Sequence, residues 1–334
     1  MARLAAILRA LGRALRRDQK SLQSVAGNNF FIVSVLLLQE AGGFVYLIVG
    51  LVLLFPLSTD PLRKIPRSRL EMWPLEARER HLLRALSPWV NPVTWAIAAL
   101  AIWAARGRVT VGLWGLAAGV AAAAFALSEL PGGPAHGLLR RVPHFPGPLD
   151  ELVRKNIREM FGTLDFYCGL ILAVSVAIWR LAGKPLPAEG LLALTLLVVL
   201  AFSSYAQCLF GLDGRGGMSR YRLLPLAGWK ILAAKDAAFL CVVIPLTLML
   251  APLAGVGAAL IALAVGHEPA VNQLRPQARW RFSSGAGVVY GLFQAGAMAM
   301  AAAGIFYNGA WVLGACAGAW GMSVWWYGRV LERG

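Results

Sequence analysis

Three observations predict an all-α protein, a polytopic transmembrane helix bundle of about ten membrane segments. First, 58% of the 334 residues are hydrophobic, only 14% are charged, and the mean hydropathy is +0.64. Second, the apolar residues occur in long runs, each of a length that suits a membrane segment. Third, Lys and Arg gather in the short segments between those runs, as the positive-inside rule requires of cytoplasmic loops.

The strongly basic balance is explained by membrane topology and not by nucleic acid. The formal net charge is +16, but the basic residues do not line one soluble face. With both termini placed in the cytoplasm, all but four of the 32 Lys and Arg fall in cytoplasmic segments. The four exceptions are Arg106, Arg108, Arg180 and Lys184.

Cysteine and histidine give no sign of a metal or a disulfide framework. The four cysteines lie in apolar runs without CxxC spacing and are expected to be packing residues. All four histidines, including His267, are expected in solvated loops, and none has the spacing of a metal site.

The first membrane half is predicted over residues 1–130. It opens with a basic amphipathic helix, which we expect in the cytoplasmic interface with its apolar stripe towards the lipid. A hairpin follows, in which Glu40 is the one charged residue of its apolar part, and its short legs leave open whether it crosses or is re-entrant. The order of elements is: interface helix 2–21, hairpin 22–57, basic loop 63–84, and spans 90–105 and 109–128.

A connector rich in Pro and Gly, residues 131–148, separates this half from the second half, 149–334. The second half repeats the order of interface helix, hairpin and basic loop. Its predicted elements are an amphipathic helix 149–160, spans 161–182 and 189–210, a loop 211–236, two short crossings within 237–266, a basic loop 267–284, and spans 285–305 and 309–328.

The loop after residue 210 carries the most distinctive pattern in the chain. FGLDGRGGMSRYRLLPLAGWKILAAKD combines a glycine-rich turn with a basic amphipathic segment that begins near Pro225. This string resembles the cytoplasmic loop of type-2 ATP-binding-cassette (ABC) export permeases, in which a short coupling helix docks on a separate ATPase subunit. The matching residues are Arg220, Tyr221, Leu224, Pro225, Leu226 and Lys235, whereas Asp236 stands where an Asn is expected.

A second copy of the pattern lies in the first half. RLEMWPLEARERHLLR aligns without a gap on RYRLLPLAGWKILAAK, and the positions of Arg69 and Arg220 place the copies 151 residues apart. Arg69, Pro74, Leu75 and Arg84 fall on Arg220, Pro225, Leu226 and Lys235. The alignment indicates an internal duplication.

The resemblance implies a permease subunit of an exporter in a prokaryotic inner membrane. Pro225 and Leu226 would form the docking face, Arg220 and Lys235 would pair with acidic residues of the ATPase, and the four aligned residues of the first half would do the same. The chain has no GxxxxGK[ST] phosphate loop, so ATP and Mg²⁺ would belong to the partner ATPase, and this chain is expected to be neither an enzyme nor a cofactor protein. If both loops dock, one chain binds two ATPases; otherwise the chain is expected to form a homodimer.

Two other classes of function remain open. A carrier or channel without an ATPase would use Glu40 and Asp165, the clearest acidic residues within predicted spans, as ion or substrate sites. For Asp165 the competing interpretation is a side chain that reaches the near interface. A membrane enzyme ranks third, because the sequence has no GxSxG elbow. Nothing in the sequence identifies the substrate.

Overall fold

The computed structural model divides the chain into two compact units, one near the N-terminus and one that holds the C-terminal helices. It describes residues 2–17, 62, 65, 70, 72–90, 95, 149–181, 186–213, 221, 225–273, 275, 277, 283 and 285–333. Several predictions lie outside these residues: the hairpin 22–57 with Glu40, the span 109–128, most of the span 90–105, the connector 131–148, Arg69 and Arg220. Throughout the described residues, all regular structure is helical, as predicted.

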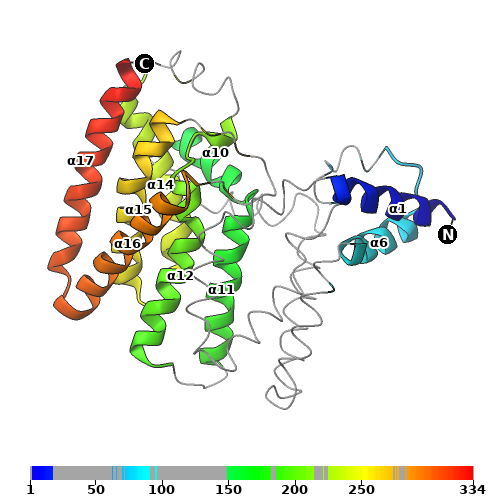
Figure 1. The fold of residues 1–334 in the computed structure, drawn as a ribbon, viewed down its shortest axis with the longest axis horizontal. Helices are drawn as coiled ribbons and strands as arrows, with labels where there is room; N and C mark the ends of the chain where they lie inside the picture. Colours follow the sequence, from blue (N-terminus) through cyan, green and yellow to red (C-terminus); the bar gives the residue numbers. More distant parts are fainter. Residues whose placement is uncertain are drawn as a thin grey trace. The chain divides into compact units, whose positions relative to one another are not determined.

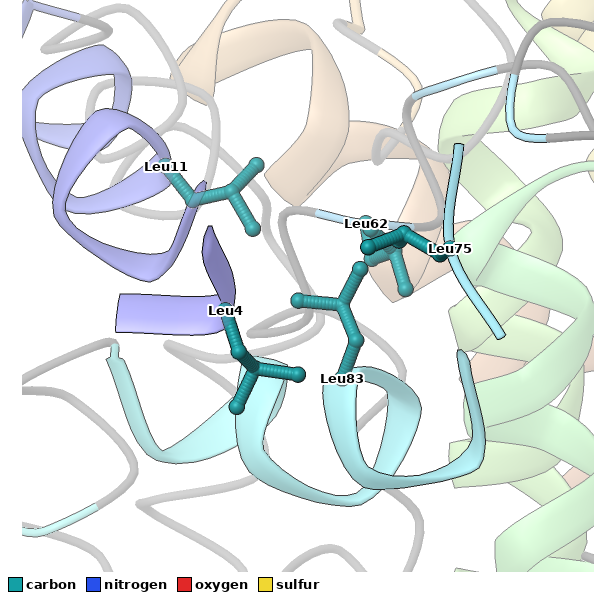
Figure 2. Close-up of a cluster of buried hydrophobic side chains, with 5 residues drawn as sticks. All are labelled: Leu4, Leu11, Leu62, Leu75 and Leu83. Atoms are coloured by element: carbon teal, nitrogen blue, oxygen red, sulfur yellow. The ribbon is translucent and has the colours of Figure 1, made fainter. Parts of the chain in front are cut away.

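The described part of the first unit contains two amphipathic helices, α1 (Ala2–Arg17) and α6 (Ala77–Leu86), and a short helical turn, η2 (Ser87–Val90) (Figure 1). Leu4 and Leu11 of α1 are buried in a leucine cluster with Leu83 of α6 (Figure 2). Leu62 and Leu75 complete that cluster. Leu4 and Leu11, two residues of the apolar stripe predicted for the interface helix, are therefore covered by protein.

The second unit is a bundle of long helices (Figure 1). In chain order its elements are α10 (Asp150–Met160), α11 (Leu164–Leu181), α12 (Ala188–Ala206), a short turn η3 (Gly211–Asp213), α14 (Gly228–Thr247), α15 (Pro252–Asn272), α16 (Val288–Asn308) and α17 (Trp311–Arg333).

Helix α15 lies at the centre of the bundle and packs against α12, α14, α16 and α17. Small residues permit these close approaches, as they commonly do between membrane helices. A Cβ atom at Gly266 would lie 2.7 Å from the backbone oxygen of Ala206 in α12, and one at Gly257 would lie 2.1 Å from Ile305 of α16. Because its neighbour is backbone, Gly266 sets the distance between the axes of α15 and α12, whereas the Ile305 side chain could move to accept a Cβ at Gly257.

Three described helices, α12, α15 and α16, are long and apolar enough to cross a membrane. Helices α10 and α11 pass the same test as a pair, but the chain bends by 77° between them. These helices indicate a membrane protein. Of the about ten predicted segments, the described residues contain three that could cross a membrane, or four if α10 and α11 form one span. Most of the first half lies outside the described residues.

Two predicted boundaries in the second half are wrong. Helix α14 begins at Gly228, inside the predicted loop 211–236, and α15 continues to Asn272, inside the predicted loop 267–284. The run 237–266 therefore belongs to two full-length helices joined at 248–251, not to two short crossings. The physical reason is that Asp236 and His267, whose polarity indicated loop, find hydrogen-bond partners inside the bundle.

Candidate functional site

Among the described residues of the loop that carries the ABC-permease resemblance, the exposed ones lie within 225–230, at the start of α14. Pro225 and Lys230 are exposed, Leu226 is half-buried, and the Trp229 side chain is 47% exposed. The Lys230 ammonium lies 5.6 Å from the centre of the Trp229 ring. The extended backbone of Ala227 (φ −61°, ψ 142°) leads from Pro225 and Leu226 into the first turn of α14.

The first turn of α14 is fixed to the C-terminal part of α17. The Gly228 amide donates a hydrogen bond of 2.8 Å to the carboxylate of Glu332, which satisfies one of the free N–H groups at the helix start. The two backbones also approach closely, because a Cβ at Gly228 would lie 2.3 Å from the Gly328 oxygen. Side chains at the start of α14 are therefore presented from a rigid support.

Beneath this segment, Asp213 of η3 is the centre of a buried charge network. Its carboxylate accepts hydrogen bonds from Lys235 Nζ at 2.8 Å, from the Tyr221 hydroxyl at 2.8 Å and from Lys155 of α10. Lys235 also donates to the Leu209 carbonyl at 2.7 Å and to Asn156 Oδ1 at 3.2 Å. The network ties η3, Tyr221, α10 and α14 together at the cytoplasmic end predicted for this loop.

The charges in this network balance. Two lysines, Lys155 and Lys235, lie beside two carboxylates, those of Asp213 and Glu159. The Glu159 carboxylate is 3.6 Å from the Lys155 ammonium, and Asp213 pairs with both lysines. Burial acts to raise the pKa of Asp213, but the neighbouring Lys235 and Lys155 outweigh burial and hold this pKa below its ordinary value. Burial, together with the Asp213 charge, raises the pKa of Tyr221, so its phenol remains a donor.

Two residues predicted to contact an ATPase are internal. The side chain of Lys235 is 2% exposed and bound to Asp213, and Tyr221 is 6% exposed and donates to the same carboxylate. Neither is available to pair with a partner chain, in contrast to the role inferred for Lys235. A docking face on this loop, as the resemblance predicts, would therefore exclude both residues.

The aligned loop of the first half also contains both exposed and buried residues among those predicted to dock. Pro74 is exposed, and Arg84 is half-buried in the last turn of α6. Leu75, by contrast, is only 7% exposed and belongs to the leucine cluster (Figure 2). Of the predicted docking residues in this loop, Leu75 is therefore not available to a partner.

The predicted substrate-path residue Asp165 is fully buried near the start of α11. Its carboxylate accepts hydrogen bonds from the backbone amide of Ser283, at 3.1 Å, and from the Ser283 hydroxyl. These bonds anchor the chain at Ser283, between α15 and α16.

A second buried polar cluster, which the sequence pattern does not predict, joins α14, α15 and α17. His267 lies 3.0 Å from Asp236 through Nε2 and 2.9 Å from Ser323 through Nδ1. Trp320 donates to the other oxygen of Asp236 at 2.8 Å. The one available signal was a carboxylate and an imidazole at opposite ends of a single apolar run, Asp236 and His267.

The described residues include no cluster of three or more His, Cys, Asp or Glu side chains that could hold a metal ion. Comparison with protein-family models, with curated proteins and with solved structures found no match to this chain.

Proposed function

We propose that this chain is the membrane permease subunit of an ABC-type exporter in a prokaryotic inner membrane. ATP and Mg²⁺ would be bound by a separate ABC ATPase subunit. One observation carries the proposal. Asp213, Tyr221 and Lys235 of the string that resembles type-2 export permeases form a single buried network beneath an exposed segment, 225–230. A loop supported in this way suits the transmission of force from a partner.

The segment 225–230 has the composition expected of a docking face. It presents Pro225, the exposed part of Trp229 and the Lys230 ammonium. Large aromatic side chains flanked by basic groups dominate the binding energy of many protein interfaces. The expected counterpart on the ATPase is an apolar groove with an acidic rim.

Helix α14 supports a mechanical role for this face. It is continuous over 20 residues, or about 30 Å at 1.5 Å per residue, so a displacement of its first turn moves the whole helix. Its contact with α17 through Gly228, Gly328 and Glu332 would carry α17 with it. ATP hydrolysis in the partner would then rock these helices between inward-open and outward-open states.

The proposal includes an internal duplication. Helix α6 begins at Ala77 and α14 at Gly228, and this separation equals the spacing of the aligned loops. The residues before the two helices, Glu76 and Ala227, have the same extended backbone conformation. In addition, α1 packs on α6, and α10, which has the corresponding place in the second half, packs on α14.

The duplication bears on stoichiometry. Pro74 is exposed, so a first-half docking face would consist of Pro74 and its exposed neighbours, without Leu75. One chain with two such faces binds two ATPases. A chain in which only 225–230 docks requires a homodimer.

An ATPase-independent carrier or channel is supported less well. It requires Asp165 to exchange an ion or to contact substrate, but the Asp165 carboxylate is buried and bonded to Ser283. Glu40, the other residue on which this alternative depends, lies outside the described residues.

The test is co-purification from the native membrane. The chain is solubilised in detergent as wild type and as the double variant Pro225→Ala, Leu226→Asp. We expect a subunit with a Walker A motif to co-purify with wild type and to be lost from the variant, because the aspartate places a charge in the apolar docking face.

The matched control is Pro187→Ala, Ala188→Asp. Both of these residues are exposed, at the opposite end of α12 from η3, and Asp is favourable in the first turn of a helix. The control should retain the ATPase. Absence of an ATPase from wild type would exclude the proposed function, and equal retention by both variants would exclude 225–230 as the docking face.

A further inference from the structure

The cluster of Asp236, His267 and Ser323 joins three helices, and the proposed docking mechanism does not use it. Asp236 and His267 are fully buried. Besides the two contacts of His267, Trp320 Nε1 donates to Asp236 Oδ2, and the Ser323 hydroxyl lies 2.8 Å from the Ala264 carbonyl. The members come from α14, α15 and α17.

The hydrogens available to this cluster can be counted. The Ser323 hydroxyl has one hydrogen but two neighbours, His267 Nδ1 at 2.9 Å and the Ala264 oxygen at 2.8 Å. A carbonyl oxygen only accepts, so a serine that donates to Ala264 must accept from Nδ1–H. The contact between Nε2 and Asp236 needs a further hydrogen, on either the ring or the carboxyl group.

All four contacts are therefore satisfied only when the pair of His267 and Asp236 carries one proton more than a carboxylate and a neutral imidazole. That proton also makes the pair neutral overall. A net charge is costly in a buried, apolar setting unless it is paired. Without the extra proton, the pair is negative and one of the two Ser323 contacts loses its hydrogen.

We propose that Asp236, His267 and Ser323 form a binding site for a single exchangeable proton between α14, α15 and α17. When the proton is bound, Nδ1–H bonds to Ser323 and the site links α15 to α17. When it leaves, Nδ1 is bare, and Ser323 bonds to either His267 or Ala264. Proton release thus weakens one contact between two helices of the bundle.

Asp236 is the charged group in direct contact with the His267 imidazole, because the nearby ionisable groups have other partners or lie farther away. On α14 the Lys235 ammonium is bound to Asp213, and on α16 the Tyr290 hydroxyl bonds to the Val265 carbonyl. The Tyr327 ring of α17 lies 6.4 Å from the imidazole, centre to centre. The Arg329 guanidinium of α17 lies over the Trp325 ring. Further groups on these helices include Glu268 next to His267, Tyr205 on α12, Asp165 on α11, which is bound to Ser283, and Lys155 and Glu159 on α10, which pair with each other.

The experiment is ¹⁵N nuclear magnetic resonance of the full-length chain in lipid nanodiscs, with labelled histidine. The chain has four histidines, and the signal lost in His267→Gln assigns the residue. Spectra are recorded from about pH 5 to about pH 9, the range around which histidine ordinarily titrates. We expect Nδ1 of His267 to carry a hydrogen at the acidic end and to lose it in one step.

Two variants that retain the histidine should move this step in opposite directions. Asp236→Asn removes the charge that favours the bound proton, so the step should shift to lower pH by about one unit or more, a tenfold weaker affinity. Trp320→Phe removes a hydrogen bond that stabilises the charged carboxylate, so the step should shift to higher pH. A purely structural role for the cluster does not predict opposite signs.

Ser323→Ala keeps the proposal testable if Asp236→Asn does not fold, as judged by gel filtration. It removes the acceptor of Nδ1–H and should also shift the step to lower pH. The proposal is overturned if Nδ1 of His267 keeps one protonation state over the whole range. It is equally overturned if Trp320→Phe shifts the step in the same direction as Asp236→Asn or Ser323→Ala, or if none of the variants moves it.

Discussion

At the scale of single residues, Asp213 is expected to have a large effect on stability. It lies between two lysines, and its side chain and that of Lys235 are each 2% exposed. A buried ion pair contributes little more to folding stability than a well-packed apolar pair of similar volume. Removal of one partner, however, leaves an uncompensated buried charge. The energetic importance of Asp213 is therefore greatest when it alone is changed.

Asp213→Asn should lower the free energy of unfolding by about 3–5 kcal/mol, because Lys235 remains buried without a carboxylate. Equilibrium denaturation in detergent micelles measures this loss. The double variant Asp213→Asn, Lys235→Met should recover most of it, since no buried charge remains on α14 at this position.

The control for this pair is Glu189→Gln, which changes the same charge at an exposed position of α12 and should alter stability by less than about 0.5 kcal/mol. If the single and double variants of Asp213 were equally unstable, burial of the Lys235 charge would not be the cause.

Among the helices, the crossing of α14 and α17 decides how the proposed docking segment is held. Gly228 and Gly328 lie against each other's backbones, and a Cβ at Gly328 would be 2.6 Å from the Trp229 Cα. A backbone atom at this distance cannot move aside in the way that a flexible side chain does. The two glycines therefore permit the crossing that places Glu332 on the first turn of α14.

Gly328→Ala should separate α17 from α14, destabilise the protein and weaken ATPase retention, because the added methyl group meets backbone. Gly318→Ala, in the same helix, is the matched control. A Cβ there has open space around it, and alanine favours helix by about 1 kcal/mol over glycine. Thermal unfolding and co-purification of both variants compare the two positions, and equal behaviour would contradict a role for the crossing.

For the whole molecule, a crossing of the membrane by α12 would place the two ends of this helix on opposite sides. It is one of the three described helices that can cross a membrane; Glu189 lies in its first turn, and η3 follows its end. Lys235 bonds to the carbonyl of Leu209 just before η3, so the start of α14 lies at that same end. Glu189 and Lys230 should therefore face opposite sides of the membrane.

Labelling of introduced cysteines with a membrane-impermeant maleimide checks this arrangement. In a background with Cys241→Ala, which removes the exposed native thiol, Lys230→Cys should react only from the cytoplasmic face and Glu189→Cys only from the other face. The background protein controls for labelling of the remaining cysteines. Reaction of both sites from one face would show that α12 does not cross.

The sequence by itself determined the class of structure. Apolar runs and the placement of Lys and Arg are properties of the chain in order, so they predicted helices that suit a membrane and located α11, α12, α16 and α17 to within a few residues. The glycine-rich string also identified the segment that contains the exposed residues Pro225, Trp229 and Lys230. These features depend on local composition, which tertiary contacts do not alter.

Only the tertiary structure decided what individual polar residues do. Lys235, predicted to face a partner, is paired with Asp213; His267, predicted in a loop, is bonded to Asp236; and Leu75, predicted to dock, is packed in a leucine cluster. In each case the deciding contact joins residues far apart in the chain. A polar side chain indicates a loop or a surface only until a distant partner satisfies its hydrogen bonds, and that partner is fixed by helix packing and not by sequence spacing.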